Sequence, residues 1–396
     1  MNKKSRAIDL LIVTALIVAV VGISHFVVVS PLGPSRLLYH IQLPLIQWTT
    51  KCSDGAPAWM ANIQQYSAKN MTAPASQLAF IAPDSDELYH CETGWKDGVF
   101  GDELLQSKAR FRFASTTKTV TAIAVLNLIA NNALSMDDTV VDVLELGGDL
   151  QDPRVGDITI EHLLSHRAGW DRLRTQDVMF MKDVKPWCPY DPEQLATTSL
   201  LNAPGEVKGY SNVGYCLLGL VIEKVTGQKF REYISEYFDF ESGTLAFIDG
   251  RYLDDEVVYD FRHENFYTET YFENFDFNSL SSSAGLSGSA SDLAILVRQS
   301  LKSEPLTILD GGMANNCDPA QIQSCYGYGV YRYQPASDTM PLFIHEGKLP
   351  GATSVVIVDP MEGVLVWLGA GAVRPGVNAH QNFYDHIREA LVHHYQ

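Results

Sequence analysis

The strongest apolar pattern in the chain is a run over residues 10–29, which only Thr14, Ser24 and His25 interrupt. About 20 such residues are enough to cross a bilayer as a helix, so the run predicts an uncleaved membrane anchor within residues 1–30. A cleaved signal peptide is the alternative, although its apolar stretch is usually shorter, and the sequence shows no convincing cleavage site. A buried helix is a third interpretation, which fits a long terminal run less well.

After the anchor, the pattern predicts a stalk and then one domain. Residues 31–73 are expected to form a stalk with one short helix near 58–67, and residues 74–396 are expected to form the domain. The expected elements of the domain are a β-hairpin over 77–82 and 87–91, a helix over 115–134 that is apolar on nearly every side and therefore buried, strands over 342–345, 353–358 and 364–368, and a closing helix over 378–394.

Strand patterns lie at both ends of the domain, and helical patterns lie between them. The sheet is expected over about 74–135 and 285–396, with a mostly helical insertion over about 136–284. A sheet must bury at least one face against other elements, so helices are expected to flank it. The predicted fold class is α+β, an α/β sandwich whose single antiparallel sheet is assembled from both ends of the chain.

Charge is distributed unevenly along the sequence. The 396 residues include 29 Lys and Arg against 47 Asp and Glu, and the net charge is −18. Residues 1–36 carry +3, so the rest of the chain carries −21. An acidic surface argues against nucleic-acid binding, which needs basic residues to neutralise phosphates. Basic residues before the apolar run predict a cytoplasmic N-terminus, so we expect a membrane-anchored, extracytoplasmic domain, periplasmic in a bacterium.

Six cysteines fit an oxidising compartment without fixing how they pair. No CxxC pair occurs, which argues against zinc ribbons and thioredoxin-like sites. Cys317 and Cys325 are close enough in sequence to close a short loop. Cys216 lies in an apolar run and fits a buried free thiol equally well. Six cysteines allow 15 full pairings, so the connectivity stays open.

The first motif with candidate chemistry is Ser115-Thr116-Thr117-Lys118, at the start of the buried helix. Ser and Lys three residues apart share one helical face. A serine at a helix N-terminus meets free backbone N–H groups, which favour negative charge on an attacked carbonyl. A poorly solvated lysine has a lowered pKa and can act as a base toward the serine. A helix cap followed by a solvated lysine would give the same pattern.

The second motif is Tyr210-Ser211-Asn212. A tyrosine near a cationic lysine can lose its proton more easily and relay it. An asparagine can hold both a substrate amide and the lysine. By itself the motif is explained as well by a packed loop tyrosine and an asparagine that caps the next helix.

The third motif is His345-Glu346-Gly347, at the end of an expected strand. Gly347 would let a substrate approach the strand closely. The backbone N–H of Lys348 could complete an oxyanion hole with the N–H of Ser115. An ordinary turn after a strand is the alternative.

The order of these motifs resembles the β-lactamase-related serine hydrolases, which include class C β-lactamases, serine D-Ala-D-Ala carboxypeptidases, D-aminopeptidases and related esterases. The resemblance spans about residues 77–391 and implies a β-lactamase/transpeptidase-like fold. The similar segments are ARFRFASTTK at 109–118, ITIEHLLSHRAGW at 158–170, GYSNVGYCLL at 209–218, SAGLSGSASDL at 283–293, YGYGVY at 326–331 and the HxG strand.

The resemblance also implies roles for individual residues. Ser115 would be the acylated nucleophile, Lys118 would activate it, and Tyr210 would act as general acid and base. Asn212 would bind substrate, and His345 would occupy the position that is lysine in class C β-lactamases. No metal or organic cofactor is implied, and the expected partner is a small-molecule or peptide-like substrate.

Glu346 departs from the family pattern, in which Thr or Ser usually follows the His or Lys. Its carboxylate could repel a substrate carboxylate, because two unit charges about 4 Å apart at an effective dielectric of 20 cost roughly 4 kcal/mol. Poor β-lactamase and carboxypeptidase activity is therefore expected, and an uncharged ester or an amide with a free ammonium fits better. Alternatively, Glu346 points away or pairs with Lys348 or Arg374. Arg167 is a second departure and is interpreted as structural.

The sequence therefore predicts a membrane-anchored serine hydrolase that works through an acyl-enzyme. The alternatives are a carboxypeptidase or β-lactamase, and a non-catalytic penicillin-recognising or scaffold protein of the same fold.

Overall fold

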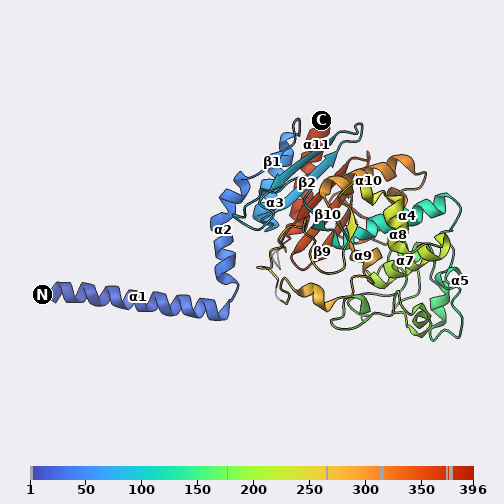
Figure 1. Ribbon diagram of the computed structural model, residues 1–396, viewed down its shortest axis with the longest axis horizontal. Coiled ribbons are helices and arrows are strands. Elements are labelled where there is room, and N and C mark those ends of the chain that lie inside the picture. The colour runs from blue at the N-terminus through green and yellow to red at the C-terminus, as the bar shows by residue number, and fades with distance from the viewer. Residues whose placement is uncertain (1–2, 176, 265, 313–315, 372, 374–377) are drawn as a thin grey trace.

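An eight-stranded antiparallel sheet forms the centre of the molecule. The computed structural model describes residues 3–396 except 176, 265, 313–315, 372 and 374–377. The sheet order is β1-β3-β2-β11-β10-β9-β8-β7, so strands from both ends of the chain meet where β2 pairs with β11 (Figure 1). This confirms the predicted sheet. Its strands are β1 (Lys51–Cys52), β2 (Ser76–Ile81), β3 (Leu88–Thr93), β7 (Cys325–Tyr326), β8 (Tyr331–Tyr333), β9 (Leu342–Leu349), β10 (Ala352–Val358) and β11 (Val364–Gly369).

Each face of this sheet has its own apolar core, because strand side chains alternate between faces. In β11, Leu365 and Trp367 belong to one core, whereas Val364, Val366 and Leu368 belong to the other. The helices α3 (Ala58–Asn70) and α11 (Ala379–Tyr395) cover the first face. The helix α10 (Ala290–Ser303) covers the second face, toward the inserted part. The predicted α/β sandwich is therefore present.

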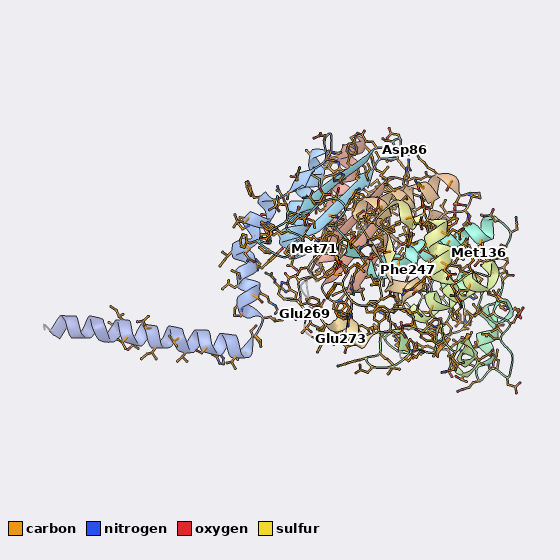
Figure 2. The ribbon with its side chains drawn as sticks, viewed as in Figure 1. Met71, Asp86, Met136, Phe247, Glu269 and Glu273 are labelled. Carbon is orange, nitrogen blue, oxygen red and sulfur yellow. A yellow bond between two sulfur atoms is a disulfide. The ribbon has the colours of Figure 1, made fainter. Side chains whose placement is uncertain are left out.

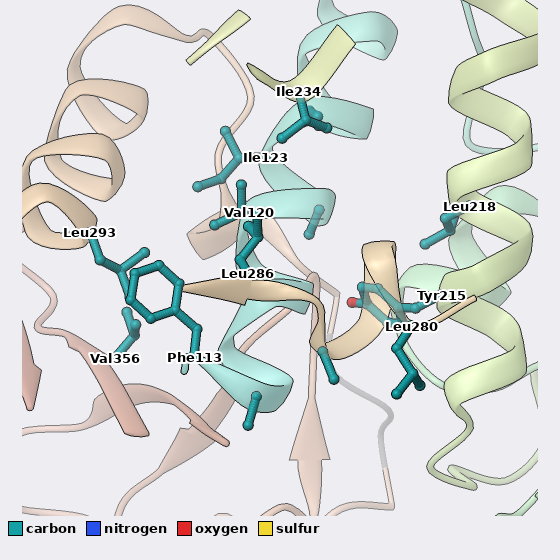
Figure 3. Packing of buried hydrophobic residues seen from close by; sticks show 14 of the residues in the cluster. Phe113, Val120, Ile123, Tyr215, Leu218, Ile234, Leu280, Leu286, Leu293 and Val356 are labelled. Carbon is teal, nitrogen blue, oxygen red and sulfur yellow. The ribbon is translucent and has the colours of Figure 1, made fainter. Parts of the chain in front are cut away.

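The inserted part packs around α4 (Thr117–Ala130), which is buried on nearly every side as predicted. Figure 3 shows Val120 and Ile123 of α4 among apolar side chains of the sheet and the insertion. A second sheet, β4-β6-β5, was not predicted. The remaining elements are β4 (Phe111–Arg112), β5 (Ala246–Phe247), β6 (Leu286–Gly288), α5 (Val140–Val143), α6 (Ile160–Leu164), α7 (Asn212–Thr226), α8 (Phe230–Tyr237), α9 (Ser281–Ala284) and the 3-10 helices η1 (Ala114–Thr116), η2 (Pro153–Asp157), η3 (Val178–Phe180), η4 (Pro192–Thr197), η5 (Phe240–Ser242), η6 (Tyr271–Asn274) and η7 (Ile308–Asp310).

The first helix, α1 (Lys3–Val29), projects away from the rest of the molecule, and the side chains drawn on it extend into open space (Figures 1 and 2). The sequence predicts a membrane-spanning helix in this region. Among the residues that the structure describes, however, no helix combines the length and the apolar character needed to cross a membrane. The predicted transmembrane helix is therefore not found.

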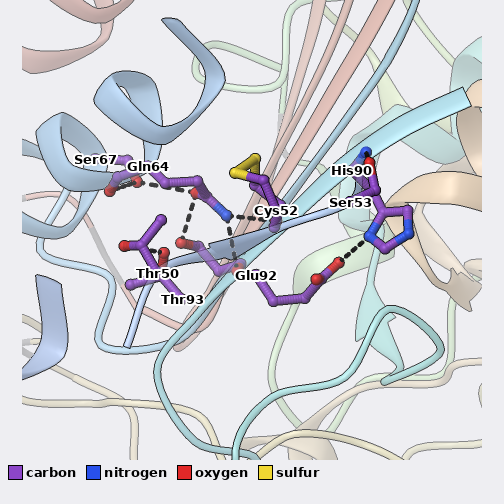
Figure 4. The surroundings of a disulfide bond; sticks show 10 residues. Thr50, Cys52, Ser53, Gln64, Ser67, His90, Glu92 and Thr93 are labelled. Carbon is purple, nitrogen blue, oxygen red and sulfur yellow. Dashed lines mark hydrogen bonds and ion pairs between the residues drawn. A yellow bond between two sulfur atoms is a disulfide. The ribbon is translucent and has the colours of Figure 1, made fainter. Parts of the chain in front are cut away.

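Residues 31–73 differ from the predicted stalk because most of them pack on the domain. The helix α2 (Gly33–Trp48) packs on α3, and α3 lies on the sheet. The side-chain amide of Gln64, on α3, donates to the carbonyl of Ser76 at 3.0 Å and to that of Cys91 at 2.7 Å (Figure 4). Met60 and Ile63 on the same helix are fully buried against the sheet. Burial of these two apolar side chains favours packing of the segment on the domain.

All six cysteines form disulfide bonds. One bond joins β1 to β3 at the sheet edge (Figure 4), and another joins α7 to the loop before it. The predicted short loop closed by Cys317 is confirmed. The free-thiol interpretation of Cys216 is wrong, because a cysteine 28 residues earlier lies within bonding distance. The pairs are Cys52–Cys91, Cys188–Cys216 and Cys317–Cys325.

Candidate active site

Ser115 lies in η1, the short turn that leads from β4 into α4, and its side chain is partly exposed. The strand before it is fixed from inside the protein. Buried Arg112 donates to the carboxylate of Glu256 at 2.6 Å and to the hydroxyl of Tyr271 at 3.0 Å. Ala114 has φ 48°, a left-handed conformation that is strained for a residue with a Cβ. This sharp turn presents Ser115 to a pocket.

Lys118 lies one turn further along and is fully buried. Its Nζ lies 3.2 Å from Oγ of Ser115 and 2.8 Å from the carbonyl oxygen of Ser283 on α9. Burial lowers the pKa of Lys118 well below its usual range, against the opposing effect of the Asp177 carboxylate. A neutral amine therefore forms far more readily than on a solvated lysine, and it lies within reach of the serine proton. The structure thus brings together the predicted Ser–Lys pair.

Tyr210 lies just before α7, with its ring centroid 5.0 Å from Nζ of Lys118. The His166 ring packs on it at 4.2 Å between centroids, and the guanidinium of Arg172 lies 4.9 Å from its centroid. Burial raises the pKa of Tyr210, and this outweighs the opposing effect of its hydrogen bond with Ser115. The sequence predicts easier loss of the phenol proton beside a cationic lysine. The structure instead favours a neutral phenol, because burial disfavours the phenolate.

Asn212 is the first residue of α7 and is buried. Its Nδ2 donates to Oδ2 of Asp177 at 2.6 Å. Its Oδ1 has no hydrogen-bond partner among the described residues. The amide that the sequence assigns to substrate binding is therefore held on one side by a carboxylate that the sequence analysis did not identify.

His345 lies on β9, and its ring is buried behind the pocket rather than in its lining. Its Nδ1 donates to the carbonyl oxygen of Gly329 at 2.5 Å, and the hydroxyl of Tyr326 lies 3.1 Å from the same nitrogen. Burial, assisted by the charge of Lys118, lowers the pKa of His345 to about 3. A neutral His345 cannot supply the cation that lysine supplies at this position in class C β-lactamases.

Gly347 brings β9 against the backbone around the serine. A Cβ placed on Gly347 would lie 2.3 Å from the carbonyl oxygen of Phe113 and 2.9 Å from the backbone nitrogen of Ser115. The glycine is therefore needed for the approach of the strand to the nucleophile, whereas the sequence analysis connected it with the approach of a substrate.

The backbone N–H of Lys348 lies on the side of β9 that does not pair with β10. Leu349 and Ala352 close the hairpin between β9 and β10, and Lys348 is the next position along β9. In an antiparallel hairpin this alternation turns the N–H of Lys348 away from β10. On the other side, β8 pairs with β9 only as far as Ile344. Since Lys348 lines the pocket, its N–H is a candidate donor to a ligand there.

The pocket at Ser115 has a volume of about 110 Å³. Two of its cations, Arg172 and Lys348, are exposed, and neither forms an ion pair within the described part of the chain. Its lining residues are Ser115, Arg172, Tyr210, Gln323, Glu346, Gly347, Lys348 and His380.

Glu346 borders this pocket, but other side chains already hold its carboxylate. Tyr384 donates to Oε2 at 2.5 Å, Gln323 donates to Oε1 at 2.5 Å, and Nδ1 of His380 lies 3.2 Å from Oε2. These partners lower the pKa of Glu346 to about 2, although burial alone would raise it. The carboxylate is ionised and forms no ion pair with Lys348. Arg374, the other predicted partner, lies outside the described residues.

Three residues around the reacting groups were not predicted from the sequence: His166, Arg172 and Asp177. His166 falls within the segment 158–170, so its place in a family motif was a usable signal. Arg172 and Asp177 follow that segment in an irregular loop and carried no such signal. They also line a neighbouring cavity of about 380 Å³, whose apolar walls include Trp170 and Trp187. Arg167, as expected, makes structural contacts, with the carbonyl of Gly312 at 3.2 Å.

Comparison with known proteins identifies a family and relatives of this chain. The Beta-lactamase family model matches residues 84–239. FimD of Dichelobacter nodosus serogroup D, named as a fimbrial assembly protein, is 37% identical over 375 residues, which cover 94% of each chain. Esterase EstB of Burkholderia gladioli is 32% identical over 164 residues, 38% of this chain and 41% of the esterase.

Solved structures share the fold at lower identity. The D-amino acid amidase from Ochrobactrum anthropi SV3, complexed with L-phenylalanine amide, has a TM-score of 0.66 at 18% identity and covers 85% of this chain and 98% of its own. A penicillin-binding protein from Bacillus halodurans has a TM-score of 0.62 at 23% identity, and the match covers 80% of this chain and 96% of that protein. At these identities the likeness concerns the fold alone.

Proposed function

Because the chain belongs to the β-lactamase family of serine hydrolases, we propose that it hydrolyses an ester or amide through an acyl-enzyme on Ser115. The observation that carries the proposal is the 3.2 Å contact between Oγ of Ser115 and Nζ of buried Lys118. A serine is a weak nucleophile until a nearby base removes its proton. A desolvated lysine one helical turn away is such a base.

In the proposed acylation, Oγ of Ser115 attacks the substrate carbonyl carbon while its proton passes to Nζ of Lys118. The carbonyl oxygen becomes an oxyanion, which the backbone N–H groups of Ser115 and Lys348 receive. The bond to the leaving group then breaks, and the leaving group takes a proton from the neutral phenol of Tyr210. Lys118 returns its proton to Tyr210, so both groups end the step as they began.

Deacylation follows the same route with water in place of the leaving group. The phenol of Tyr210 passes its proton to Nζ of Lys118 and takes one from water as the water oxygen attacks the acyl carbonyl. The bond from the acyl carbon to Oγ breaks, and the proton returns to Ser115. The products are a carboxylic acid and the regenerated serine.

We further propose that the preferred substrate is an uncharged ester or an amide with a free ammonium. The support is the ionised carboxylate of Glu346 in the lining of the Ser115 pocket. Its hydrogen bonds to Tyr384 and Gln323, and the cations Arg172 and Lys348 nearby, reduce its repulsion of a substrate carboxylate below the bare Coulomb value.

An extracytoplasmic location is also part of the proposal. Six paired cysteines are typical of proteins in oxidising compartments, because cytosolic reductants keep thiols reduced.

A role in fimbrial assembly is the second candidate, and the observation that favours it is the 37% identity to FimD over 94% of both chains. In that role the fold would serve as a non-catalytic scaffold or binding protein, in which Ser115 does not react.

A fluorophosphonate probe applied to the full chain separates the two candidates. We expect the wild-type protein to be labelled, Ser115→Ala to remain unlabelled, and the control Ser303→Ala, at an exposed serine on α10, to be labelled like the wild type. Turnover of p-nitrophenyl esters, D-amino acid anilides and nitrocefin would then identify the substrate class. Folded wild-type protein that resists the probe and turns over none of these substrates would refute the hydrolase and favour the scaffold.

A further inference from the structure

The side-chain carboxylate of Asp177 contacts the predicted substrate-binding residue Asn212 and forms no ion pair among the described residues. Asp177 is the residue before η3, and its Oδ1 accepts a hydrogen bond from the backbone N–H of Met179 at 3.2 Å. Its Oδ2 accepts a hydrogen bond from Nδ2 of Asn212 at 2.6 Å. None of the ion pairs within 4.0 Å among the described residues involves Asp177. Burial raises the pKa of this carboxyl.

The contact with Asp177 fixes which way the amide of Asn212 faces. An ionised carboxylate only accepts hydrogen bonds, so it binds the NH₂ group of the amide and not its oxygen. The opposite atom, Oδ1, is buried and has no partner in the described part of the chain. A buried amide oxygen without a partner is costly, and it is relieved when a donor arrives. The contact therefore leaves Oδ1 of Asn212 as a buried acceptor without a partner among the described residues, two residues after Tyr210.

Asp177 also acts on Lys118 through its charge, which favours the ammonium form of the lysine. Within the part of the chain that the structure describes, the other groups near Nζ of Lys118 are neutral or cationic. They are the hydroxyl of Ser115, the carbonyl of Ser283, the rings of Tyr210 and Tyr215, the buried rings of His166 and His345, and the guanidinium of Arg172. When Lys118 takes the serine proton, it becomes an ammonium in this poorly solvated site. Among these groups, Asp177 provides the compensating negative charge.

We propose that Asp177 is a positioning residue of the hydrolase: it orients the amide of Asn212 and supplies the counter-charge for Lys118 at the moment when Lys118 accepts the serine proton. This inference rests on the proposed function, because it assumes that Lys118 cycles between amine and ammonium. It adds a carboxylate, from a loop outside the three sequence motifs, to the machinery of the site.

The test is Asp177→Asn in the full chain, with the pH profile of kcat/KM and the separate values of kcat and KM as readouts. Removing the negative charge lowers the pKa of Lys118, so the acid limb of the profile should move to lower pH. The weaker base and the loss of amide orientation should lower kcat about 10- to 100-fold, while KM changes little. A structural contribution alone would reduce the amount of folded protein and leave the acid limb in place.

Asp171→Asn is the matched control. Asp171 lies in the same loop, and its carboxylate accepts a backbone N–H from Leu173 at 2.9 Å, much as Asp177 accepts one from Met179. Asp171 is not among the charges that act on Lys118. We expect its pH profile and kcat to match the wild type.

If Asp177→Asn fails to fold, Asp177→Ser keeps a side-chain acceptor for the Met179 N–H while removing the charge. A wild-type pH profile and kcat in either folded variant would overturn the proposal. A wild-type protein that shows no Ser115-dependent labelling or turnover would instead refute the proposed function, and the positioning role with it. Labelling that depends on Ser115, combined with an unchanged profile in the variant, would refute the positioning role alone.

Discussion

Replacing Gly347 with alanine should separate β9 from the nucleophile. The added Cβ would lie 2.3 Å from the carbonyl oxygen of Phe113, 2.3 Å from Oγ of Ser354 and 2.9 Å from the backbone nitrogen of Ser115. An ordinary contact begins at 3.4 Å, so the strand or the turn must move by about 1 Å. Two of the three contacted atoms are backbone atoms, so a change of rotamer cannot relieve them.

The expected consequence is a large loss of activity with a moderate loss of stability. A displacement of about 1 Å at the reacting groups can cost about 100-fold in rate, and overpacking of this kind costs about 1–3 kcal/mol in unfolding free energy. The rate of fluorophosphonate labelling measures the first effect, and urea unfolding measures the second. Gly147→Ala is the control, because Gly147 has no heavy atom within 4 Å of the added Cβ. Labelling of Gly347→Ala within twofold of the wild-type rate, in a folded protein, would refute the reasoning.

Two further predictions concern charge at the site. The kcat/KM of the wild-type enzyme should rise with pH through the pKa of Lys118 and reach half its plateau well below pH 10.5, because only the neutral amine accepts the serine proton; a profile that rises only around pH 10.5 would contradict the buried-base mechanism. Glu346→Thr should raise nitrocefin turnover about tenfold, because it removes an ionised carboxylate from the pocket lining. Unchanged nitrocefin turnover in the folded variant would remove the electrostatic argument for uncharged substrates.

Much of the sheet could be predicted because its apolar patterns are local and strong. The β2–β3 hairpin, α4, the strands β9 to β11 and α11 each have continuous or alternating apolar positions. The sheet β4-β6-β5 could not be predicted in this way. Its strands are two or three residues long, and they pair residues far apart in sequence, such as Arg112 with Ser287. Packing of the inserted part creates those pairs, and strands this short have no hydrophobic periodicity that would predict them from the sequence.

The same distinction between local and long-range contacts explains which residues of the site could be predicted. Ser115 and Lys118 were found because one helical turn fixes their separation. Asp177 was not found because its contact with Asn212, 35 residues later, depends on the path of an irregular loop. The surroundings of Glu346 were hidden for a similar reason. Its hydrogen-bond donors, Tyr384 on α11 and Gln323 in a loop, come from other parts of the chain.

The three disulfides have a simple order along the chain, since each cysteine is bonded to its nearest neighbour in sequence: first to second, third to fourth, and fifth to sixth. A chain that enters an oxidising compartment from its N-terminus exposes its thiols in that same order. If an external disulfide or other two-electron oxidant oxidises each pair as its second thiol appears, the native set, one of 15 possible, forms without reshuffling. The sheet, by contrast, cannot close until β9 to β11 arrive, because β2 must wait for β11 near the end of the chain. Covalent links can thus form before the tertiary structure is complete, and the Cys52–Cys91 bond would hold β1 on β3 before β11 reaches β2.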